Sequence, residues 1–423
     1  MKYGMLILLC ISLVLEGLTQ SINLEKPNVE HAGFSAGRLN RLDSFMQQQV
    51  QNGRMAGGAA LILRNGHTAY YQSWGYNDEA RKSSLPKDAI FRIASQTKAI
   101  TSVGIMLLYE EGKLLLSDPV EKYIPEFKDQ QVIQSFRLSD TTFTAVPAKR
   151  KVTIHDLLTH SSGIGYPYIG SPEAIALYHK HAIPAGIGMK EENLAVAMKT
   201  LGKLPLFHQP GEKWTYGLNT DLLGYLIELI SGQTLDAFFR TRIFEPLGMR
   251  DTYFNLPKEK HSRLATLFIP DETGRLKPFD SSDWELDGNF PMGNSRYYSG
   301  GAGLSSTLKD YGIFLQMLLN QGEYNGVRLL SRNSVRMMTS NQIGALSLGN
   351  SKFGLGFSIV TEADAAKDPW QVGTYGWGGA FATTYWVDPK ENMVVLFFRQ
   401  VWGDRDREIN EKFKVLTYQA IND

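Results

Sequence analysis

The sequence predicts an α/β (α+β) fold: an antiparallel sheet, formed from both ends of the chain and flanked by helices, carries an inserted, mostly helical lobe. Three observations lead to this prediction. A β-hairpin pattern lies near the start of the chain, at residues 59–71. Two more strand patterns, at residues 382–387 and 393–398, lie near its end. Between these strands, apolar residues recur mostly at helical spacing, so we expect strands from the two chain ends to pair across a helical insertion.

The composition is that of an ordinary globular protein. The 423 residues carry 44 Lys and Arg against 43 Asp and Glu, giving a formal net charge of +1. No basic stripe or acidic tail is present, so nucleic acid is not expected as a partner. The only cysteine, Cys10, lies in the apolar N-terminal segment. A mature chain without it has no thiol, which excludes disulfides, zinc–cysteine sites and a cysteine nucleophile.

Residues 1–19 are predicted to be a signal peptide. Lys2 supplies the positive start, and residues 5–15 form an uncharged apolar run. Gly17 and Thr19 then place small side chains before a possible cleavage at the next residue. The alternative is a retained membrane anchor, for which the apolar run is short. We therefore expect a secreted or periplasmic protein without a stable membrane anchor.

The first elements of the mature chain are a helix and the hairpin. Apolar residues recur at helical spacing over residues 39–46, so Ser35 is expected to cap this helix. Residues 33–37 also match the G-x-S-x-G pattern of α/β-hydrolases, but the polar segment before them lacks the strand that this motif requires. In the hairpin, Asn65-Gly66 forms the turn between two β-rich runs.

Helices dominate the middle of the chain. Apolar faces predict helices at residues 101–111, 154–159, 220–231 and 308–320. Residues 167–190 and 268–298 are rich in Gly, Pro and Asp and are expected to be long loops. A last helix is predicted at residues 407–420.

These elements define one domain, residues 33–423, with two lobes. The α/β lobe is expected to comprise roughly residues 33–95 and 330–423, and the helical lobe roughly residues 100–325. No internal repeat or low-complexity tract indicates a further domain.

A Ser-x-x-Lys pattern, a candidate for nucleophilic chemistry, occurs three times. Pro86 interrupts the copy that begins at Ser84, so that pair cannot rely on helical spacing. The copy that begins at Ser306 opens an amphipathic helix in which Lys309, beside Asp310, is expected to be solvated. Neither copy is expected to be reactive.

The third copy, Ser95-Gln-Thr-Lys98, precedes a run without any charged residue. Residues 99–109 are apolar around most of a helical circumference, which predicts a buried helix. At i,i+3 spacing the side chain of Lys98 leans back over Ser95. Burial disfavours the charged form of an amine, and a neutral amine can take a proton from a neighbouring hydroxyl. We therefore predict Ser95 as the nucleophile and Lys98 as its general base, against the alternative of a surface serine and a solvated lysine.

Four more motifs follow the Ser95 motif along the chain. They are residues 152–163 (V-T-I-H-D-L-L-T-H-S-S-G), 210–216 (P-G-E-K-W-T-Y), 300–307 (G-G-A-G-L-S-S-T) and 377–380 (W-G-G-A). With the Ser95 motif, they resemble the serine β-lactamase and penicillin-binding-protein superfamily, in its branch of β-lactamase-related carboxylesterases close to class C enzymes. The resemblance runs roughly from residue 33 to the C-terminus. It implies the fold described above, with the active site in the cleft between the lobes and no cofactor.

Carried over residue by residue, the resemblance assigns further roles. Tyr216 takes the place of the tyrosine that relays a proton to the leaving group, although it could also be a loop tyrosine packed on the next helix. The amides of Ser95 and Ala380 would form the oxyanion hole. Leu218 stands where penicillin-recognising members place an asparagine, and Asn219, one residue later, is expected to cap the following helix.

The third family motif, Lys-Thr-Gly in β-lactamases, reads Trp377-Gly378-Gly379 here. Two glycines before a strand allow a substrate to approach the backbone closely, and the alternative reading is a β-bulge. Tyr166 and Tyr168 lie in the loop after Ser161-Ser162-Gly163 and are candidates for lining the entrance of the cleft, the alternative being that they pack the lobe. The residues expected to contact substrate are Trp377, Gly378, Gly379, Leu218, Tyr166 and Tyr168.

The histidines offer weaker alternatives. His155 and His160 would suit a Ser–His pair, but His155 lies beside Asp156 on a short helix, which favours a structural role. His179 and His181 alternate like metal ligands, in a polar segment without a neighbouring carboxylate or cysteine, so no metal site is expected.

The sequence thus predicts a serine hydrolase that forms an acyl-enzyme on Ser95 and acts on a small ester or amide. The missing amide at Leu218 and the missing basic residue at Trp377 favour esters. A β-lactamase or D-alanyl (D-amino-acid) peptidase is the alternative with the same nucleophile. A non-catalytic ligand-binding sensor with the same fold is the alternative from another functional class.

Overall fold

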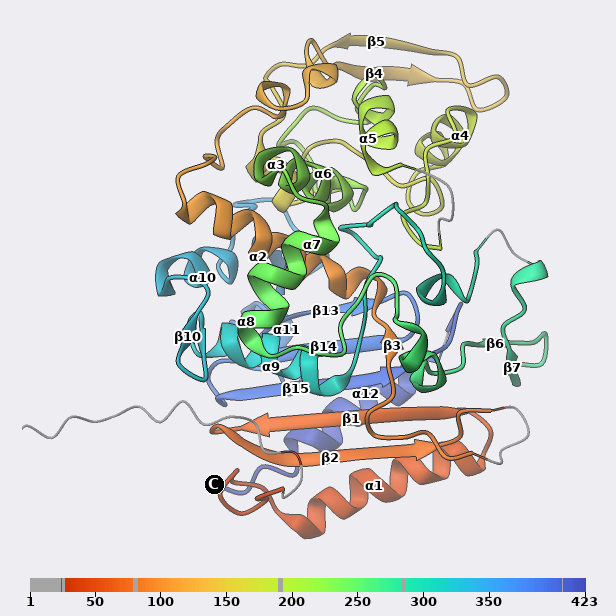
Figure 1. Cartoon of the computed structure of the whole chain (residues 1–423), viewed down its shortest axis with the longest axis vertical. Coiled ribbons are helices and arrows are strands. Elements are labelled where there is room, and N and C mark those ends of the chain that lie inside the picture. The colour runs from red at the N-terminus through yellow and green to blue at the C-terminus, as the bar shows by residue number, and fades with distance from the viewer. Residues whose placement is uncertain (1–23, 25–26, 79–82, 189–192, 284–285, 405) are drawn as a thin grey trace, which may run out of the picture.

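The computed structural model describes residues 24, 27–78, 83–188, 193–283, 286–404 and 406–423 (Figure 1). Its centre is a seven-stranded antiparallel sheet in the order β11-β12-β13-β14-β15-β1-β2. The strands are β1 (Gly57–Arg64), β2 (His67–Gly75), β11 (Lys352–Phe353), β12 (Ser358–Ile359), β13 (Tyr375–Gly379), β14 (Thr383–Asp388) and β15 (Met393–Arg399). The predicted sheet from both chain ends is confirmed.

The two chain ends join where β1 pairs with β15, with Leu61 opposite Leu396. Every residue of β15 is buried, as expected for a central strand covered on both faces. The predicted hairpin turn is present: Asn65 and Gly66 both have positive φ, at +54° and +75°, as a type I′ turn requires.

Helices α1 (Ala36–Gln51) and α12 (Arg407–Tyr418) cover one face of the sheet, and Figure 1 shows α1 below β2. The rings of Phe397 on β15 and Phe413 on α12 stack with centroids 4.5 Å apart. Ser35 caps α1 by accepting a hydrogen bond from the amide of Arg38, as predicted.

The other face packs against α9 (Leu308–Leu319) and the buried helix α2 (Thr97–Glu110), with a mostly helical region beyond them (Figure 1). Its helices are α3 (Ile154–Leu158), α4 (Pro172–Lys180), α5 (Leu194–Gly202), α6 (Asn219–Ser231), α7 (Leu235–Phe239) and α8 (Glu245–Leu247). Two more, α10 (Arg332–Met338) and α11 (Glu362–Ala365), precede β13. All of residues 97–108 are buried, so the dry helix predicted after Ser95 is confirmed.

Four small antiparallel pairs complete the fold. They are β3 (Phe91–Arg92) with β8 (Ser305–Ser306), β4 (Gln131–Phe136) with β5 (Phe143–Pro147), β6 (Phe268–Pro270) with β7 (Leu276–Pro278), and β9 (Glu323–Tyr324) with β10 (Val327–Arg328). The pairing of β3 with β8 ties the segment before Ser95 to the segment before α9.

Both loop predictions were wrong in part, since residues 268–278, inside the expected loop 268–298, form the β6–β7 pair. Residues 172–180, inside the expected loop 167–190, form α4. Ser171 caps this helix and Pro172 occupies its first position, a start signal that the surrounding glycines and prolines obscured.

The predicted signal peptide lies outside the described residues, and the two-lobe boundaries and the location outside the cytoplasm stay predictions. Within the described chain, no helix combines the length and apolarity needed to cross a membrane.

Asp310 in the first turn of α9 is a buried carboxylate without a cationic hydrogen-bond partner among the described residues. It accepts hydrogen bonds from the amide of Asp251 (2.6 Å) and the hydroxyl of Thr252 (3.0 Å). Burial raises its pKa to about 6 against these hydrogen bonds. Lys309 beside it is exposed, as predicted.

This burial predicts how the stability of an Asp310→Asn variant depends on pH. Because the folded state holds the Asp310 proton more tightly than the unfolded state, its stabilising contribution is complete below about pH 4 and is lost as pH rises through about 6. Relative to the wild type, Asp310→Asn should therefore gain up to about 3 kcal/mol between pH 4 and pH 7.5. Urea unfolding of both proteins at the two pH values measures this gain. A stability difference that is equal at both pH values would contradict the prediction.

Candidate active site

Ser95 lies in a single 3₁₀ turn, η1 (Ala94–Gln96), between β3 and α2, and its residue surface is 8% exposed. The preceding Ala94 has a φ of +43°, and Ala382, just beyond β13, has a φ of +61°. A left-handed conformation costs a non-glycine residue about 1–3 kcal/mol and persists where the surrounding structure imposes it. The backbone is thus held in an uncommon path directly before the predicted nucleophile.

Lys98 is buried, with 2% of its surface exposed, and its amine is surrounded by oxygen atoms. Nζ lies 2.8 Å from the carbonyl oxygen of Gly301, 2.9 Å from the hydroxyl of Tyr166 and 3.4 Å from Oγ of Ser95. The structure therefore brings Ser95 and Lys98 together as the i,i+3 spacing predicts.

The segment around Gly301 is fastened along one face of α2. Three hydrogen bonds join them: Lys98 Nζ to the Gly301 carbonyl, the Thr101 hydroxyl to the Gly300 carbonyl (2.6 Å), and the Leu304 amide to the Thr97 hydroxyl (3.1 Å). These polar contacts lie on a helix that is otherwise packed in the core, so the segment has one well-defined position against it.

Tyr166, expected at the cleft entrance, instead lies beside the lysine. It is 1% exposed, and burial together with its tyrosine neighbours raises the pKa of its hydroxyl well above the ordinary value. A neutral phenol accepts the hydrogen bond from Lys98 and keeps a proton to donate. Tyr168 is half-buried, with its ring centroid 5.1 Å from that of Tyr166, so it is the more accessible of the two.

Tyr216, predicted to relay the proton, presents its ring to Lys98. The centroid of this ring lies 4.7 Å from Lys98 Nζ. Its hydroxyl accepts a hydrogen bond from the indole N–H of Trp377 at 3.2 Å. Tyr216 and Trp377 are both half-buried, so the two side chains form a linked wall of the site.

The glycines after Trp377 bring β13 close to the nucleophile. A Cβ on Gly379 would lie 2.4 Å from the carbonyl oxygen of Ile93, two residues before Ser95, so only glycine fits. Ala380, the next residue, is therefore placed near η1, where the resemblance expects its amide to complete an oxyanion hole. Gly378 is exposed, and both glycines pair regularly with β14, which excludes a β-bulge here.

The expectations for Leu218 and Asn219 were wrong. Helix α6 begins at Asn219, one residue earlier than expected, which turns Leu218 into the main core with no exposed surface. Asn219 does not cap the helix. Its Nδ2 lies 2.9 Å from Nδ1 of His160, and its Oδ1 accepts a hydrogen bond from Ser162 Oγ at 2.5 Å. Leu218 thus does not line the cleft, and the amide of Asn219 is engaged away from it.

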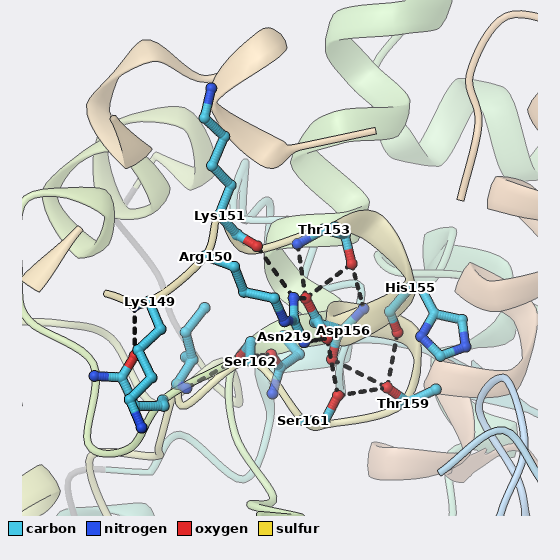
Figure 2. Close-up of polar contacts among 12 residues, drawn as sticks. Lys149, Arg150, Lys151, Thr153, His155, Asp156, Thr159, Ser161, Ser162 and Asn219 are labelled. Atoms are coloured by element: carbon cyan, nitrogen blue, oxygen red, sulfur yellow. Dashed lines mark hydrogen bonds and ion pairs between the residues drawn. The ribbon is translucent and has the colours of Figure 1, made fainter. Parts of the chain in front are cut away.

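Figure 2 shows what holds the loop that carries His160 and Ser162. The carboxylate of Asp156 accepts two hydrogen bonds from Arg150, at 2.6 and 2.8 Å, and closes a capping box with Thr153 at the start of α3. It also accepts a hydrogen bond from Ser161 at 3.2 Å. These hydrogen bonds hold the Asp156 carboxylate within the loop, and it does not pair with a histidine as in a catalytic triad.

His160 was not among the predicted site residues. It has a φ of +55°, is 1% exposed, and its ring centroid lies 5.0 Å from that of Tyr216. Burial and the charge of Lys98 lower its pKa well below the ordinary value, so it supports Tyr216 as a neutral ring. The motif T-H-S-S-G contains the residue, but nothing in its spacing indicates contact with Tyr216.

The side chains present do not suggest a metal centre. The described residues include no group of three or more His, Cys, Asp or Glu placed to bind a metal ion. His179, one of the two histidines considered as ligands, contacts the carbonyl oxygen of Pro167 through Nε2 at 2.8 Å.

Comparisons with known proteins identify the family and the fold of the chain. Residues 42–419 match the Beta-lactamase family. The chain is 29% identical to the esterase EstB of Burkholderia gladioli, over 86% of this chain and 90% of that protein. It is 28% identical to a putative D-alanyl-D-alanine carboxypeptidase of Escherichia coli K12, over 88% of this chain and 84% of that protein. The solved structure of EstCE1, a hydrolase with promiscuous acyltransferase activity, shares the fold with a TM-score of 0.77 and 24% identity, covering 91% of this chain and 98% of that one.

The contact between Tyr166 and Lys98 generates a prediction about the reactivity of Ser95. Tyr166→Phe removes the hydroxyl that holds the amine and should slow labelling of Ser95 by a fluorophosphonate about 10- to 100-fold, because the base loses its alignment. Tyr178→Phe is the matched control, since Tyr178 is equally buried and its hydroxyl accepts a hydrogen bond only from the Gly165 amide (3.3 Å). Equal labelling rates in the two variants would show that the Tyr166 hydroxyl has no part in activating Ser95.

Proposed function

This chain belongs to the Beta-lactamase family, whose members are serine hydrolases, and from this premise we propose that it is an esterase acting through an acyl-enzyme on Ser95. The observation that carries the proposal is the contact of Lys98 Nζ with Ser95 Oγ, at 3.4 Å, in a buried setting. An adjacent base is what converts a weak hydroxyl into a nucleophile.

The proposed reaction has two steps. Oγ of Ser95 attacks the ester carbonyl and passes its proton to the neutral amine of Lys98, while the carbonyl oxygen takes up negative charge. The amides of Ser95 and Ala380 receive that oxyanion. The proton then returns to the departing alkoxide by way of Lys98 and the tyrosine hydroxyls beside it. Water repeats the attack on the acyl-enzyme and releases the acid, with Ser95 regaining its proton.

The walls of the site favour esters over lactams. In lactam-processing members, the resemblance places an amide in the second motif and a basic group in the third. Here the N–H of Trp377 is used by Tyr216, and the amide of Asn219 is used by His160 and Ser162. A buried polar group of a lactam left without a partner costs roughly 1–3 kcal/mol. A simple ester needs only the nucleophile and the oxyanion hole. The relative named as an esterase supports the same choice.

Two other functions remain as alternatives. A β-lactamase or D-alanyl peptidase would use the same Ser95, and the relative named as a putative D-alanyl-D-alanine carboxypeptidase supports that reading. A ligand-binding sensor would keep the cleft without turnover. The contact of Ser95 with Lys98, together with the strained backbone before Ser95, argues for a reactive hydroxyl instead.

The nucleophile is tested by three serine variants. Ser95→Ala should abolish ester hydrolysis and fluorophosphonate labelling while leaving thermal unfolding nearly unchanged, because the lost hydroxyl contributes little to packing. Ser35→Ala removes only the cap of α1 and should keep most activity, at a stability cost of about 1 kcal/mol. Ser306→Ala should also remain active, since that hydroxyl contacts Thr252. If Ser35→Ala were inactive but unfolded normally, the nucleophile would instead be Ser35 in the G-x-S-x-G segment.

The substrate class is tested by comparing specificity constants. We expect kcat/KM for short-chain p-nitrophenyl esters to exceed that for a chromogenic cephalosporin by at least about 10- to 100-fold, the equivalent of one unpaired buried polar group. A D-alanyl amide should also be a poor substrate. Steady-state assays on all three compounds with the same wild-type preparation give the ratios. Efficient cephalosporin turnover with negligible esterase activity would restore the β-lactamase alternative.

A further inference from the structure

A second buried charge lies next to the site and has no part in the reaction as described above. Asp221, in the first turn of α6, has no exposed surface. Its Oδ1 accepts hydrogen bonds from the hydroxyls of Ser299 (2.6 Å) and Tyr297 (3.4 Å). Its Oδ2 makes no hydrogen bond to another side chain of the described residues. A carboxylate oxygen buried in this way needs a compensating positive charge nearby.

The amine of Lys98 supplies this positive charge, and Gly301 lies between it and Asp221. A Cβ added to Gly301 would lie 2.4 Å from Asp221 Oδ2 and 3.4 Å from Lys98 Nζ. The distance between Asp221 Oδ2 and Lys98 Nζ therefore cannot exceed the sum of these two distances. The carbonyl of Gly301 accepts the hydrogen bond from Lys98, so the backbone of this residue fills the space between the two charges.

The groups around Asp221 make it an anion at neutral pH. Burial raises its pKa to about 6, while the Ser299 hydrogen bond, the positive charge of Lys98, and weaker hydrogen bonds from Tyr297 and the Gly301 amide act in the opposite direction. The other titratable groups whose charges interact with Asp221 are Tyr166, Tyr168 and Tyr297. The attraction between two charges is mutual, so the carboxylate in turn stabilises positive charge on Lys98.

We propose that Asp221 is a positioning residue that stabilises the ammonium formed when Lys98 takes the hydroxyl proton of Ser95. The inference rests on the proposed function, because it assigns Asp221 a part in that reaction. In the acylation step the Ser95 O–H bond breaks, its proton joins Lys98, and an Oγ–carbon bond forms while the carbonyl electrons move to oxygen. Asp221 exchanges no proton and touches no substrate. Its negative charge balances the positive charge that appears on Lys98.

The competing explanation is purely structural. An acidic residue in the first turn of a helix interacts favourably with the helix dipole, and the hydrogen bond from Ser299 ties α6 to the neighbouring loop. A structural role affects folding and leaves the pH dependence of catalysis unchanged. The two explanations therefore differ in the shape of the pH–rate profile.

The test compares two variants of the full chain with the wild type, using p-nitrophenyl acetate between pH 5 and pH 10. Asp221→Asn keeps the size and an acceptor for Ser299 but removes the charge. We expect its plateau kcat to fall about 10- to 100-fold with KM changed less than about threefold. We also expect its ascending limb to move to lower pH, because the substitution removes a negative charge that stabilises positive charge in the site. Asp310→Asn, which removes a comparably buried carboxylate elsewhere, should keep the wild-type profile.

A double-mutant cycle asks whether Asp221 acts through Lys98. The readout is the rate at which Ser95 is labelled by a fluorophosphonate, measured in Lys98→Met with and without Asp221→Asn. Because Asp221 acts only on the lysine charge, the second substitution should have an effect below about threefold in the Lys98→Met background. A full additional loss there would overturn the proposal, as would a folded Asp221→Asn variant with an unshifted profile and a rate within threefold of the wild type.

The outcomes separate this inference from the proposed function. If the wild type neither hydrolyses p-nitrophenyl acetate nor reacts with the fluorophosphonate, the proposed function fails. If the wild type is active and the Asp221→Asn profile is unchanged, only the role of Asp221 fails. Should Asp221→Asn not fold, infrared spectra of the wild type and Lys98→Met decide instead. Without the lysine charge, the Asp221 carboxyl should keep its proton to higher pH, so its infrared band should persist to higher pH in Lys98→Met than in the wild type. The same pH dependence of the band in both proteins would overturn the proposal.

Discussion

A single buried amine determines how this site is assembled. Lys98 projects from a helix whose first three turns are buried, so its N–H groups must find acceptors inside the protein. The carbonyl of Gly301 and the hydroxyl of Tyr166 meet this need, and Oγ of Ser95 lies 3.4 Å from the same nitrogen. Each comes from a different segment, and each segment is therefore fixed relative to α2. The same requirement places the amine, which we propose as the proton acceptor, next to the hydroxyl of Ser95.

The site also depends on the meeting of distant parts of the chain. Ser95 follows the first hairpin, whereas Gly379 and Ala380 precede β14 near the other end. They come together because β1 pairs with β15 in the middle of one sheet, and because Gly379 lacks the side chain that would collide with Ile93. Contacts of such large sequence separation form only after much of the chain is ordered. Reactivity is thereby confined to the completed fold.

The sheet built from both chain ends and the contacts within one helix or turn could be predicted from the sequence, whereas the side-chain contacts between different elements of the site could not. The pairing of Ser95 with Lys98 follows from helical spacing alone, and the turn at Asn65-Gly66 follows from the positive φ that it requires. The contact of Tyr166 with Lys98 depends on how a loop packs over α2, which no local pattern records. For Leu218, the predicted start of α6 was wrong by one residue. This error was enough to place in the predicted cleft wall a side chain that is buried in the core. Asp221 escaped notice for a similar reason, because only the fold of the 297–301 segment brings it to Lys98.

The orientation of Leu218 limits how readily this enzyme could evolve a new substrate range. In a sequence comparison, replacing Leu218 by asparagine looks like the direct route to the amide of the penicillin-recognising relatives. In this fold that amide would enter the hydrophobic core, where an unsatisfied polar group costs roughly 1–3 kcal/mol, and it would not reach a ligand. Presenting an amide to the cleft requires α6 to start one residue later, which involves the backbone and also the contacts of Asn219 with His160 and Ser162. If the chain has the ester specificity proposed above, a change of helix register separates it from the lactam-processing relatives, and a single point mutation at this position does not supply that change.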